Sequence, residues 1–186
     1  MIKLALFGAG RIGKIHGHNV ALNPQAELVA LHDPYQVNAD HLSAALGCQQ
    51  MTPEQIFSDP SITGILVCSA TDTHADLIEQ AVLTSKHVFC EKPIDLSLAR
   101  VQQVVAKVNA SPITSMLAFN RRFDSNFALL QQRIAAGDIG DVELVSIISK
   151  DPSPPPVDYI KVSGGLFRDM TIHDFDMARF LLAEEV

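Results

Sequence analysis

The sequence is poor in cysteine and has no pattern that pairs cysteines. Cys48, Cys68 and Cys90 are its only three, and no C-x-x-C spacing occurs among them. An odd and sparse set of cysteines argues against a disulfide framework and is typical of free thiols in a reducing compartment. The sequence therefore favours a cytoplasmic protein without structural disulfides.

An excess of basic residues and long apolar runs are also missing. The 186 residues carry a formal net charge of −7 and the pI is about 5.4, which argues against nucleic acid or an anionic membrane as partner. No apolar run approaches the roughly 18 residues needed to cross a bilayer, and the apolar start is too short for a signal peptide. With 47% hydrophobic and 19% charged residues, the chain has material for one good core and part of a second.

Short apolar runs alternate with longer amphipathic segments over residues 1–120. This alternation predicts parallel strands joined by crossover helices, buried on both faces. The predicted strands are Ile2–Phe7, Leu28–His32, Gly64–Cys68, His87–Cys90 and Ile113–Phe119. The predicted helices are Ile12–Leu22, Asn38–Leu46, Thr73–Thr84 and Ser97–Asn109. The expected fold class is α/β, with a Rossmann doubly wound parallel sheet in a first domain over residues 1–120.

The character of the sequence changes after Phe119. Its further elements are a helix over Ser125–Ala136, a strand over Val142–Ser149, a proline-rich run over 152–156, a glycine pair at 164–165 and a helix over Thr171–Leu182. A single strand leaves both of its edges unpaired. Residues 121–186 are therefore expected to be the incomplete start of an α+β C-terminal domain.

A glycine-rich turn follows the first predicted strand and opens the first predicted helix. It reads Gly8-Ala9-Gly10-Arg11-Ile12-Gly13, a spacing that brings backbone N–H groups at a helix N-terminus to a pyrophosphate. Asp33 ends the second strand, twenty residues beyond Gly13, where its carboxylate can accept from both ribose hydroxyls and repel a 2′-phosphate. The pattern predicts NAD as the cofactor. The alternative is a structural glycine turn with Asp33 as a helix cap.

Three further loops are expected at the carboxyl edge of the sheet, where open α/β sheets bind ligands. Ser69-Ala70-Thr71 follows the third strand and is expected to lie along the cofactor, with His74 at the start of the next helix. Glu91-Lys92-Pro93 follows the fourth strand, and the proline biases Lys92 towards an extended backbone; the alternative is an ordinary surface lysine. Asn120-Arg121-Arg122-Phe123-Asp124 follows the fifth strand. Its arginines either bind substrate or pair with local carboxylates.

Asp169 and His173 are four residues apart where the last predicted helix begins, so both side chains project from one face. An imidazole can act as general base on a hydroxyl while a carboxylate orients it. Two alternatives stay open. One is a capping aspartate with a core histidine, and the other is a metal site with Asp174 or Asp176, for which a third ligand is lacking.

These motifs resemble, in the same order, the set found in one known family. The glycine turn, Glu91-Lys92-Pro93 and Asp169-Met170-Thr171-Ile172-His173-Asp174 resemble those of the glucose–fructose oxidoreductase, inositol dehydrogenase and rhizopine-catabolism (Gfo/Idh/MocA) family. Residues 163–179, and the proline run after Lys150-Asp151, resemble the inositol-oxidising members most. The resemblance covers the whole chain.

The resemblance implies a dinucleotide domain followed by a domain with a large open sheet that commonly builds tetramers. It also implies hydride transfer to NAD from a ring carbon of myo-inositol, or of a close cyclic polyol or sugar, giving a 2-keto product. At the matching positions His173 would take the hydroxyl proton, while Lys92 and Asp169 hold the hydroxyl and relay charge. The implied cofactor residues are Gly8, Gly10, Arg11, Ile12, Gly13, Asp33, Ser69, Ala70, Thr71, His74, Glu91 and Lys92, and the implied substrate residues are Asn120, Arg121, Asp151 and Thr171.

Members of this family are longer than 186 residues, so we expect a chain truncated at its C-terminus. Apolar surface is then expected to be exposed on Val142–Ser149 and on the last helix. Three hypotheses follow: a polyol dehydrogenase, a non-catalytic NAD-binding fragment or regulatory module, and an interaction protein that adds strands to another chain. The intact Lys92, Asp169 and His173 favour an enzyme.

Overall fold

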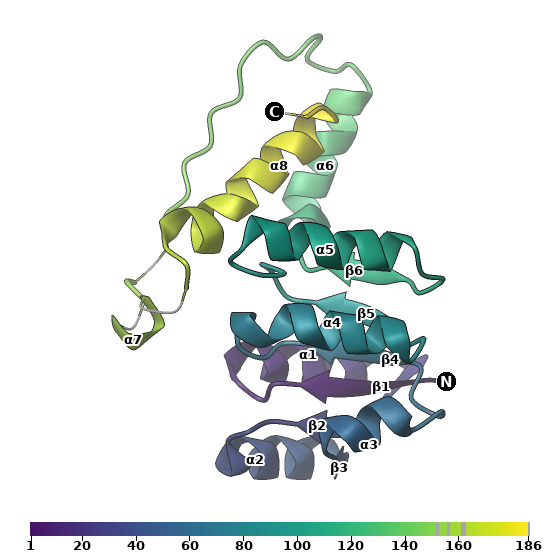
Figure 1. Cartoon of the computed structure of the whole chain (residues 1–186). Helices are drawn as coiled ribbons and strands as arrows, with labels where there is room; N and C mark the ends of the chain where they lie inside the picture. The colour runs from purple at the N-terminus through teal and green to yellow at the C-terminus, as the bar shows by residue number, and fades with distance from the viewer. Residues whose placement is uncertain (152, 156, 161–162, 186) are drawn as a thin grey trace. The chain divides into compact units, whose positions relative to one another are not determined.

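The computed structural model describes residues 1–151, 153–155, 157–160 and 163–185. The chain divides into two compact units, Met1–Ala118 and Phe119–Val186, whose helices and strands Figure 1 labels in chain order. The proline-rich run at 152–156 lies partly outside the described residues, because 152 and 156 are not among them.

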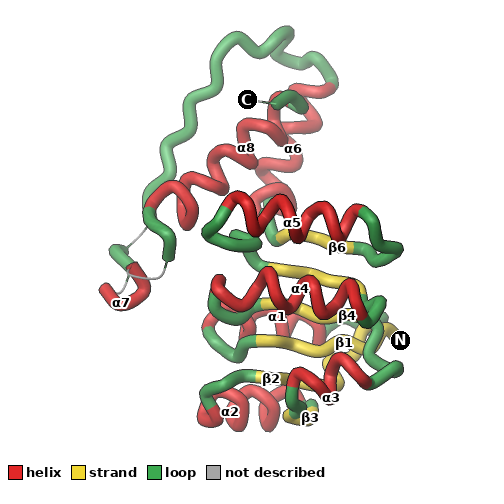
Figure 2. Tube along the Cα trace, in the orientation of Figure 1, coloured by secondary structure: helices red, strands yellow, loops and turns green. Residues whose placement is uncertain are grey.

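Six strands of the described residues form one parallel sheet in the first unit, drawn in yellow in Figure 2. The strands are β1 (Ile2–Phe7), β2 (Ala26–His32), β3 (Gln49–Gln50), β4 (Gly64–Val67), β5 (His87–Cys90) and β6 (Ser115–Leu117). Their spatial order is β3-β2-β1-β4-β5-β6. The order reverses direction between β1 and β4, which is the switch point where doubly wound sheets bind ligands. The predicted Rossmann fold is confirmed.

Helices cover both faces of the sheet because alternate side chains of each strand point to opposite sides. They are α1 (Arg11–Ala21), α2 (Gln36–Leu46), α3 (Pro53–Ser58), α4 (His74–Leu83) and α5 (Leu98–Asn109). One core, under α1 and α2, contains Leu6, Val20, Leu28, Leu31, Leu42 and Leu66. The other, under α3, α4 and α5, contains Phe7, Ile56, Ile65, Ile78 and Val104. Lys86 is also buried, at 3% exposed, and its amine donates to the carbonyl oxygens of Asp59 and Ile62.

Helices α4 and α5 lie side by side (Figure 1), and an ion-pair network joins them. Arg100 of α5 donates to Glu79 and Asp76 of α4, and Lys107 donates to Glu79 over 2.8 Å. The hydrogen bond from Arg100, with a second from Lys107, lowers the pKa of Glu79 to about 2. Glu79 therefore stays ionised throughout the neutral range and keeps the two helices in register.

The second unit is built from helices and loops among its described residues. Its elements are a 3-10 turn over Asn120–Phe123, α6 (Ser125–Ala135), α7 (Val157–Ile160), a π-helical turn over Phe167–Thr171 and α8 (Ile172–Leu182). Asp124 caps α6, because its carboxylate accepts from the backbone N–H of Asn126 at 2.9 Å. The helices predicted over Ser125–Ala136 and Thr171–Leu182 are confirmed, with the second preceded by the π-helical turn.

The strand predicted over Val142–Ser149 is wrong. Residues 142–150 are described, but they form neither helix nor strand. A strand requires a neighbouring chain segment to receive its backbone hydrogen bonds, and the described part of the second unit pairs no segment with this one. The expected exposure of apolar side chains is confirmed here, since Leu144 is 85% exposed and Ile148 is 82% exposed.

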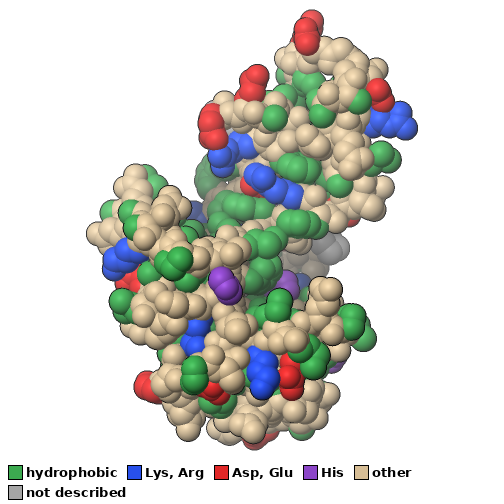
Figure 3. All heavy atoms as spheres, turned by 90° about the vertical axis from the view of Figure 1, so that its right-hand side faces the viewer, with side chains coloured by type: hydrophobic (Ala, Val, Ile, Leu, Met, Phe, Trp, Pro, Cys, Tyr) green, Lys and Arg blue, Asp and Glu red, His purple; other side chains and the backbone are tan. Residues whose placement is uncertain are grey.

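On the face of the molecule drawn in Figure 3, charged side chains of both signs are spread among hydrophobic ones. None of the described helices combines the length and the apolar character that crossing a bilayer takes.

Candidate active site

The glycine turn places an open helix N-terminus directly after β1. Gly8 has φ +97°, and a Cβ there would lie 2.5 Å from the carbonyl oxygen of Cys68. A Cβ on Gly13 would lie 1.9 Å from the carbonyl oxygen of Gly8. Both positions therefore require glycine, the first for its backbone conformation and for space, the second for the close approach of α1 to the strand.

Gly10 differs from its two neighbours because space is open around it. A Cβ built on Gly10 meets no atom within 4 Å. Gly10 is the N-cap of α1, no side chain caps this end, and the first turn contains no acidic residue. The first N–H groups of a helix have no acceptor within the helix and carry the positive end of its dipole. This turn fits a pyrophosphate, which would fill the open space and accept from those N–H groups.

Asp33 is held against the glycine turn. Its Oδ2 accepts from the backbone N–H of Ala9 at 2.5 Å, and its Oδ1 accepts from the backbone N–H of Tyr35 at 2.8 Å. The N-cap of α2 is Tyr35, without a side-chain capping bond, so the alternative of Asp33 as a helix cap is wrong. The carboxylate is fixed beside the turn and keeps lone pairs for hydroxyl donors.

The loop after β4 is closed by its own side chains and by His74. Ser69 Oγ lies 2.6 Å from Thr73 Oγ1, which donates to the carbonyl oxygen of Ala70 at 2.7 Å. His74 is 2% exposed, with Nδ1 at 2.8 Å from the carbonyl oxygen of Pro93 and Nε2 at 3.1 Å from that of Ser69. Both ring nitrogens thus face backbone carbonyls. This geometry leaves neither nitrogen for a direct bond to a cofactor.

The loop after β5 carries the Glu91-Lys92-Pro93 motif. The backbone N–H of Glu91 donates to the carbonyl oxygen of Val67 at 2.9 Å, and Glu91 Oε1 lies 2.7 Å from Nε2 of His16 on α1. The peptide bond between Lys92 and Pro93 is cis. Lys92 is half-buried at the carboxyl end of β5, as its position in the sequence predicts.

Arg121 and Arg122, in the 3-10 turn of the second unit, pair with carboxylates of α8. Arg121 Nη1 donates to Oδ1 of Asp174 at 2.5 Å and to Oγ of Ser149 at 3.1 Å. Arg122 donates twice to Asp176, from Nε at 2.8 Å and from Nη2 at 2.6 Å. Asp176 is 4% exposed, and its hydrogen bonds raise the pKa of Arg122. Of the two interpretations left open for these arginines, pairing with local carboxylates is the one observed.

These ion pairs hold two residues that follow His173 on the same helix. Asp174 and Asp176 both lie on α8 and are tied to the 3-10 turn over residues 120–123. The His173 ring lies edge-on to Phe119, with the ring centroids 6.4 Å apart. The rotation of α8, and with it the direction of the imidazole, is therefore fixed by charged pairs.

Asp169 precedes α8 in the π-helical turn over Phe167–Thr171. Its backbone N–H donates to the carbonyl oxygen of Gly165 at 3.1 Å, and the Thr171 hydroxyl donates to that of Leu166 at 3.4 Å. π-helical turns occur frequently at functional sites. Asp169, Thr171 and His173 thus share the N-terminal end of α8. Asn120 and Asp151 of the same unit are exposed.

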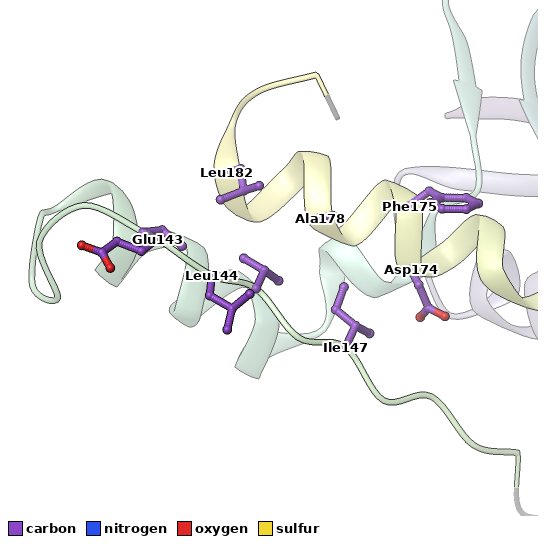
Figure 4. Close-up of a pocket in the computed structure, with 9 residues that line it drawn as sticks. Glu143, Leu144, Ile147, Asp174, Phe175, Ala178 and Leu182 are labelled. Carbon is purple, nitrogen blue, oxygen red and sulfur yellow. The ribbon is translucent and has the colours of Figure 1, made fainter.

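A cavity of about 400 Å³ in the second unit does not have the character of an active site. Figure 4 shows it between the extended segment with Leu144 and Ile147 and the α8 side chains of Phe175 and Leu182. Its lining is mostly apolar, and the Asp174 carboxylate beside it is already bonded to Arg121. Among the residues that the structure describes, no group of three His, Cys, Asp or Glu side chains is placed to hold a metal ion.

Comparison with known proteins decides the family. Residues 2–119 match a family described as an oxidoreductase family with an NAD-binding Rossmann fold, GFO/IDH/MocA, and residues 127–186 match the GFO/IDH/MocA C-terminal domain. The chain belongs to the GFO/IDH/MocA oxidoreductase family. The resemblance drawn from the motifs is confirmed.

Several GFO/IDH/MocA members are similar over nearly the whole chain. Inositol 2-dehydrogenase of Rhizobium meliloti is 50% identical over 184 residues, which is 99% of this chain and 56% of that protein. A myo-inositol dehydrogenase structure from Corynebacterium glutamicum has a TM-score of 0.91 at 48% identity, covering 97% of this chain and 55% of that one. The scyllo-inositol dehydrogenase of Lactobacillus casei, solved with NAD(H) and scyllo-inositol, has a TM-score of 0.87 at 32% identity, covering 98% and 56%. The chain spans little more than half the length of these relatives.

Sequence reasoning missed one residue of this GFO/IDH/MocA site, His16. His16 and His18 are two apart on α1 and face different directions, a spacing that by itself assigns neither of them a role. The buried residues Gly13, Gly17 and Val20 mark the face of α1 that packs on the sheet, and His16 shares that face at helical spacing. The glycine positions were thus a signal that could have placed His16 near the β5 loop.

Proposed function

We propose that this protein is an NAD-dependent oxidoreductase that moves a hydride from a ring carbon of myo-inositol, or of a close cyclic polyol or sugar, to NAD. The product would be the 2-keto inositol. The observation that carries the proposal is the glycine turn with the Asp33 carboxylate bonded to it. The names of its relatives support the substrate class, since they act on myo- and scyllo-inositol.

NAD would be held by the turn of residues 8–13 and by Asp33. The N–H groups of Arg11, Ile12 and Gly13 lie at the open end of α1 and suit the pyrophosphate. Asp33 is suited to the ribose hydroxyls and repels a 2′-phosphate, so NAD is preferred over NADP. The loop over residues 69–71 and the β5 loop with Glu91 and Lys92 would flank the cofactor from the same edge of the sheet.

Oxidation of an alcohol removes a hydride and a proton from the same carbinol group. NAD, when bound, supplies the hydride acceptor. His173 is proposed to take the hydroxyl proton at a ring nitrogen, while the Lys92 amine and the Asp169 carboxylate hold the hydroxyl and relay charge. Asn120, Arg121, Asp151 and Thr171 are proposed to line the substrate pocket. For Arg121 the pair with Asp174 supports a second role, which is to hold α8 in place.

Two further parts of the proposal concern the protein as a whole. The described cysteines are free thiols, which supports a reducing, cytoplasmic location. Homo-oligomer formation follows from the family resemblance, and the apolar side chains exposed at Leu144 and Ile148 support it. Molar mass in solution tests this part directly.

The central test is NADH formation by the purified 186-residue chain with NAD⁺ and myo-inositol. We expect steady turnover above a control without inositol, and slower turnover with NADP⁺. NAD⁺ binding without turnover would contradict the enzyme proposal for this chain and favour a nucleotide-binding fragment. That alternative has a specific basis, because the chain spans only 56% of the inositol 2-dehydrogenase it matches.

Replacing Asp33 tests the choice of cofactor. We expect Asp33→Ala to weaken NAD binding by about 10- to 100-fold, because each charge-assisted hydrogen bond contributes roughly 1.5–3 kcal/mol. We also expect NADP to bind nearly as well as NAD. Calorimetric titration with both cofactors measures this.

The control for Asp33 is Asp141→Ala, which removes an exposed carboxylate from a loop of the second unit. Asp33→Asn separates charge from backbone anchoring, since the amide oxygen still accepts from an N–H group while the negative charge is gone. If Asp33→Ala binds both cofactors with wild-type affinity, Asp33 has no part in cofactor choice.

A further inference from the structure

Lys92 stands between two residues that are each held by a histidine. Glu91, immediately before it, contacts His16 of α1, and Pro93, immediately after it, contacts His74 of α4. The two helices cover opposite faces of the sheet, because the cores beneath them take alternate residues of β1. The backbone that carries Lys92 is thus held from both faces.

On the α1 side, Nε2 of His16 lies 2.7 Å from Oε1 of Glu91. The two side chains are 22% and 20% exposed, and the His16 ring lies edge-on to Phe89 with 4.8 Å between ring centroids. A carboxylate only accepts hydrogen bonds, so Nε2 is the donor. This bond fixes the Glu91 side chain and the chain segment that leads into Lys92.

On the α4 side, His74 joins two loops through their backbones. Its Nδ1 lies 2.8 Å from the carbonyl oxygen of Pro93, and its Nε2 lies 3.1 Å from that of Ser69. Carbonyl oxygens only accept hydrogen bonds, so the ring is the donor in any hydrogen bond here. The shorter of its two contacts is that of Nδ1 with Pro93. His74 is 2% exposed, so water does not compete for this bond.

We propose that His16 and His74 are positioning residues that set where the Lys92 amine lies. The proposal rests on the proposed function in one respect, the use of Lys92 in alcohol oxidation. A lysine side chain is long and rich in rotamers, so its amine is held accurately only when the backbone beneath it is rigid. Neither histidine touches the substrate or cofactor in this proposal. Each acts through the residue next to Lys92.

If the two histidine rings serve only to fill space, their hydrogen bonds should not matter. Paired variants at each histidine separate this packing role from the positioning role. His74→Asn keeps an N–H near the position of Nδ1, whereas His74→Phe keeps the ring volume and removes both hydrogen bonds. His16→Gln keeps an N–H near the position of Nε2, whereas His16→Leu removes it. If the rings only fill space, the Phe and Leu variants behave as wild type.

The first measurement is the acylation rate of Lys92 by acetic anhydride, followed by mass spectrometry against the exposed Lys3 as internal reference. It needs neither cofactor nor turnover. Lys92 is half-buried while Lys3 is exposed. We expect the Lys92 rate to rise at least about threefold in His74→Phe and in His16→Leu, because the loosened amine becomes more accessible, and to stay near wild type in the Asn and Gln variants.

The second measurement is steady-state kinetics with NAD⁺ and myo-inositol. Misplacing a catalytic group by about 1 Å can lower the rate by about 100-fold. We expect kcat to fall at least about tenfold in His74→Phe and His16→Leu, with KM for inositol and the Kd for NAD little changed. The Asn and Gln variants should recover most of kcat.

The proposal is overturned if both His74→Phe and His16→Leu fold normally and label Lys92 at the wild-type rate. If His74→Phe does not fold, the His16 variants alone decide, since that ring is partly exposed and its loss is tolerated more easily. A wild-type chain without turnover would remove the proposed function. The labelling result would still decide whether the histidines position Lys92, so the two failures are distinguishable.

Discussion

Gly10→Ala will fold like the wild type and lose most of its affinity for NAD, whereas Gly13→Ala will lose stability. The two residues belong to the same turn, but a Cβ on Gly10 meets nothing within 4 Å and a Cβ on Gly13 lies 1.9 Å from the carbonyl oxygen of Gly8. At Gly13 the backbone must move, which costs about 1–3 kcal/mol or more in a well-packed region. At Gly10 the backbone, with φ −71°, suits alanine.

The physical reason for the Gly10 effect is the space itself. The added methyl group would occupy the opening in which we place the pyrophosphate, so that the phosphate could no longer approach the N–H groups of α1. We expect NAD affinity to fall at least about tenfold, which is about 1.4 kcal/mol. The loss of unfolding free energy should stay below about 1 kcal/mol, the typical cost of alanine at a helix N-cap.

Thermal unfolding and calorimetric titration with NAD separate the two variants. Gly47→Ala is a useful reference, because Gly47 also meets no atom within 4 Å but has φ +68°, far from the turn on the C-cap of α2. It should lose stability through backbone strain and keep its NAD affinity. Wild-type NAD affinity in folded Gly10→Ala would show that the pyrophosphate lies elsewhere.

The parts of the fold that the sequence predicted well are those with strong local patterns. β1 over Ile2–Phe7 and β5 over His87–Cys90 were predicted to the residue, because continuous apolar runs end in glycine or in a charged residue. Two short elements were missed, β3 over Gln49–Gln50 and α3 over Pro53–Ser58. Neither is long enough for periodicity to be visible.

A local signal for α3 was nevertheless present. Thr52 accepts from the Gln55 backbone N–H while the Gln55 side chain accepts from that of Thr52, a capping box, and Pro53 stands at the first helical position. Threonine followed by proline, with glutamine three residues after the threonine, is a recognisable helix start. By contrast, β3 is defined only by pairing with β2, so no pattern within it could reveal it.

The extended segment over residues 142–149 illustrates the opposite error. Its alternating apolar residues satisfy the local pattern of a strand, yet strand formation depends on a partner that the segment itself does not encode. The alternating apolar pattern can favour an extended backbone, but a strand forms only when a neighbouring segment accepts and donates its backbone hydrogen bonds.

For the candidate site, the sequence predicted which residues lie at the carboxyl edge of the sheet. It could not predict which side chains of the helices contact them. Strand ends locate Asp33, Ser69 and Glu91 at one edge, because parallel strands end together. The contacts of His16 with Glu91 and of His74 with Pro93 span 75 and 19 residues of sequence. They depend on how α1 and α4 cross the sheet, which packing determines and no short motif records.

His173 is proposed to take the proton that leaves the substrate hydroxyl. His173→Ala should lower kcat by about 100- to 10,000-fold, the usual contribution of a positioned general base, with the Kd for NAD unchanged. His173 belongs to the second unit, and the glycine turn and Asp33 that we propose to bind NAD belong to the first. The His173 substitution should therefore change turnover and leave NAD binding as it is. NADH formation with myo-inositol and calorimetric titration with NAD measure the two quantities on the same preparation.

The fold of α8 should survive this change, because Arg122 and Asp176 hold the helix through two hydrogen bonds that do not involve His173. His173→Gln preserves a polar side chain that cannot act as a general base at neutral pH, and we expect it to be nearly as inactive as alanine. His41→Ala, an exposed histidine on α2, is the matched control and should turn over like the wild type. Full activity in His173→Ala would remove the imidazole from the mechanism and leave the hydroxyl proton to another base, for which Lys92 and Asp169 would be the next variants to make.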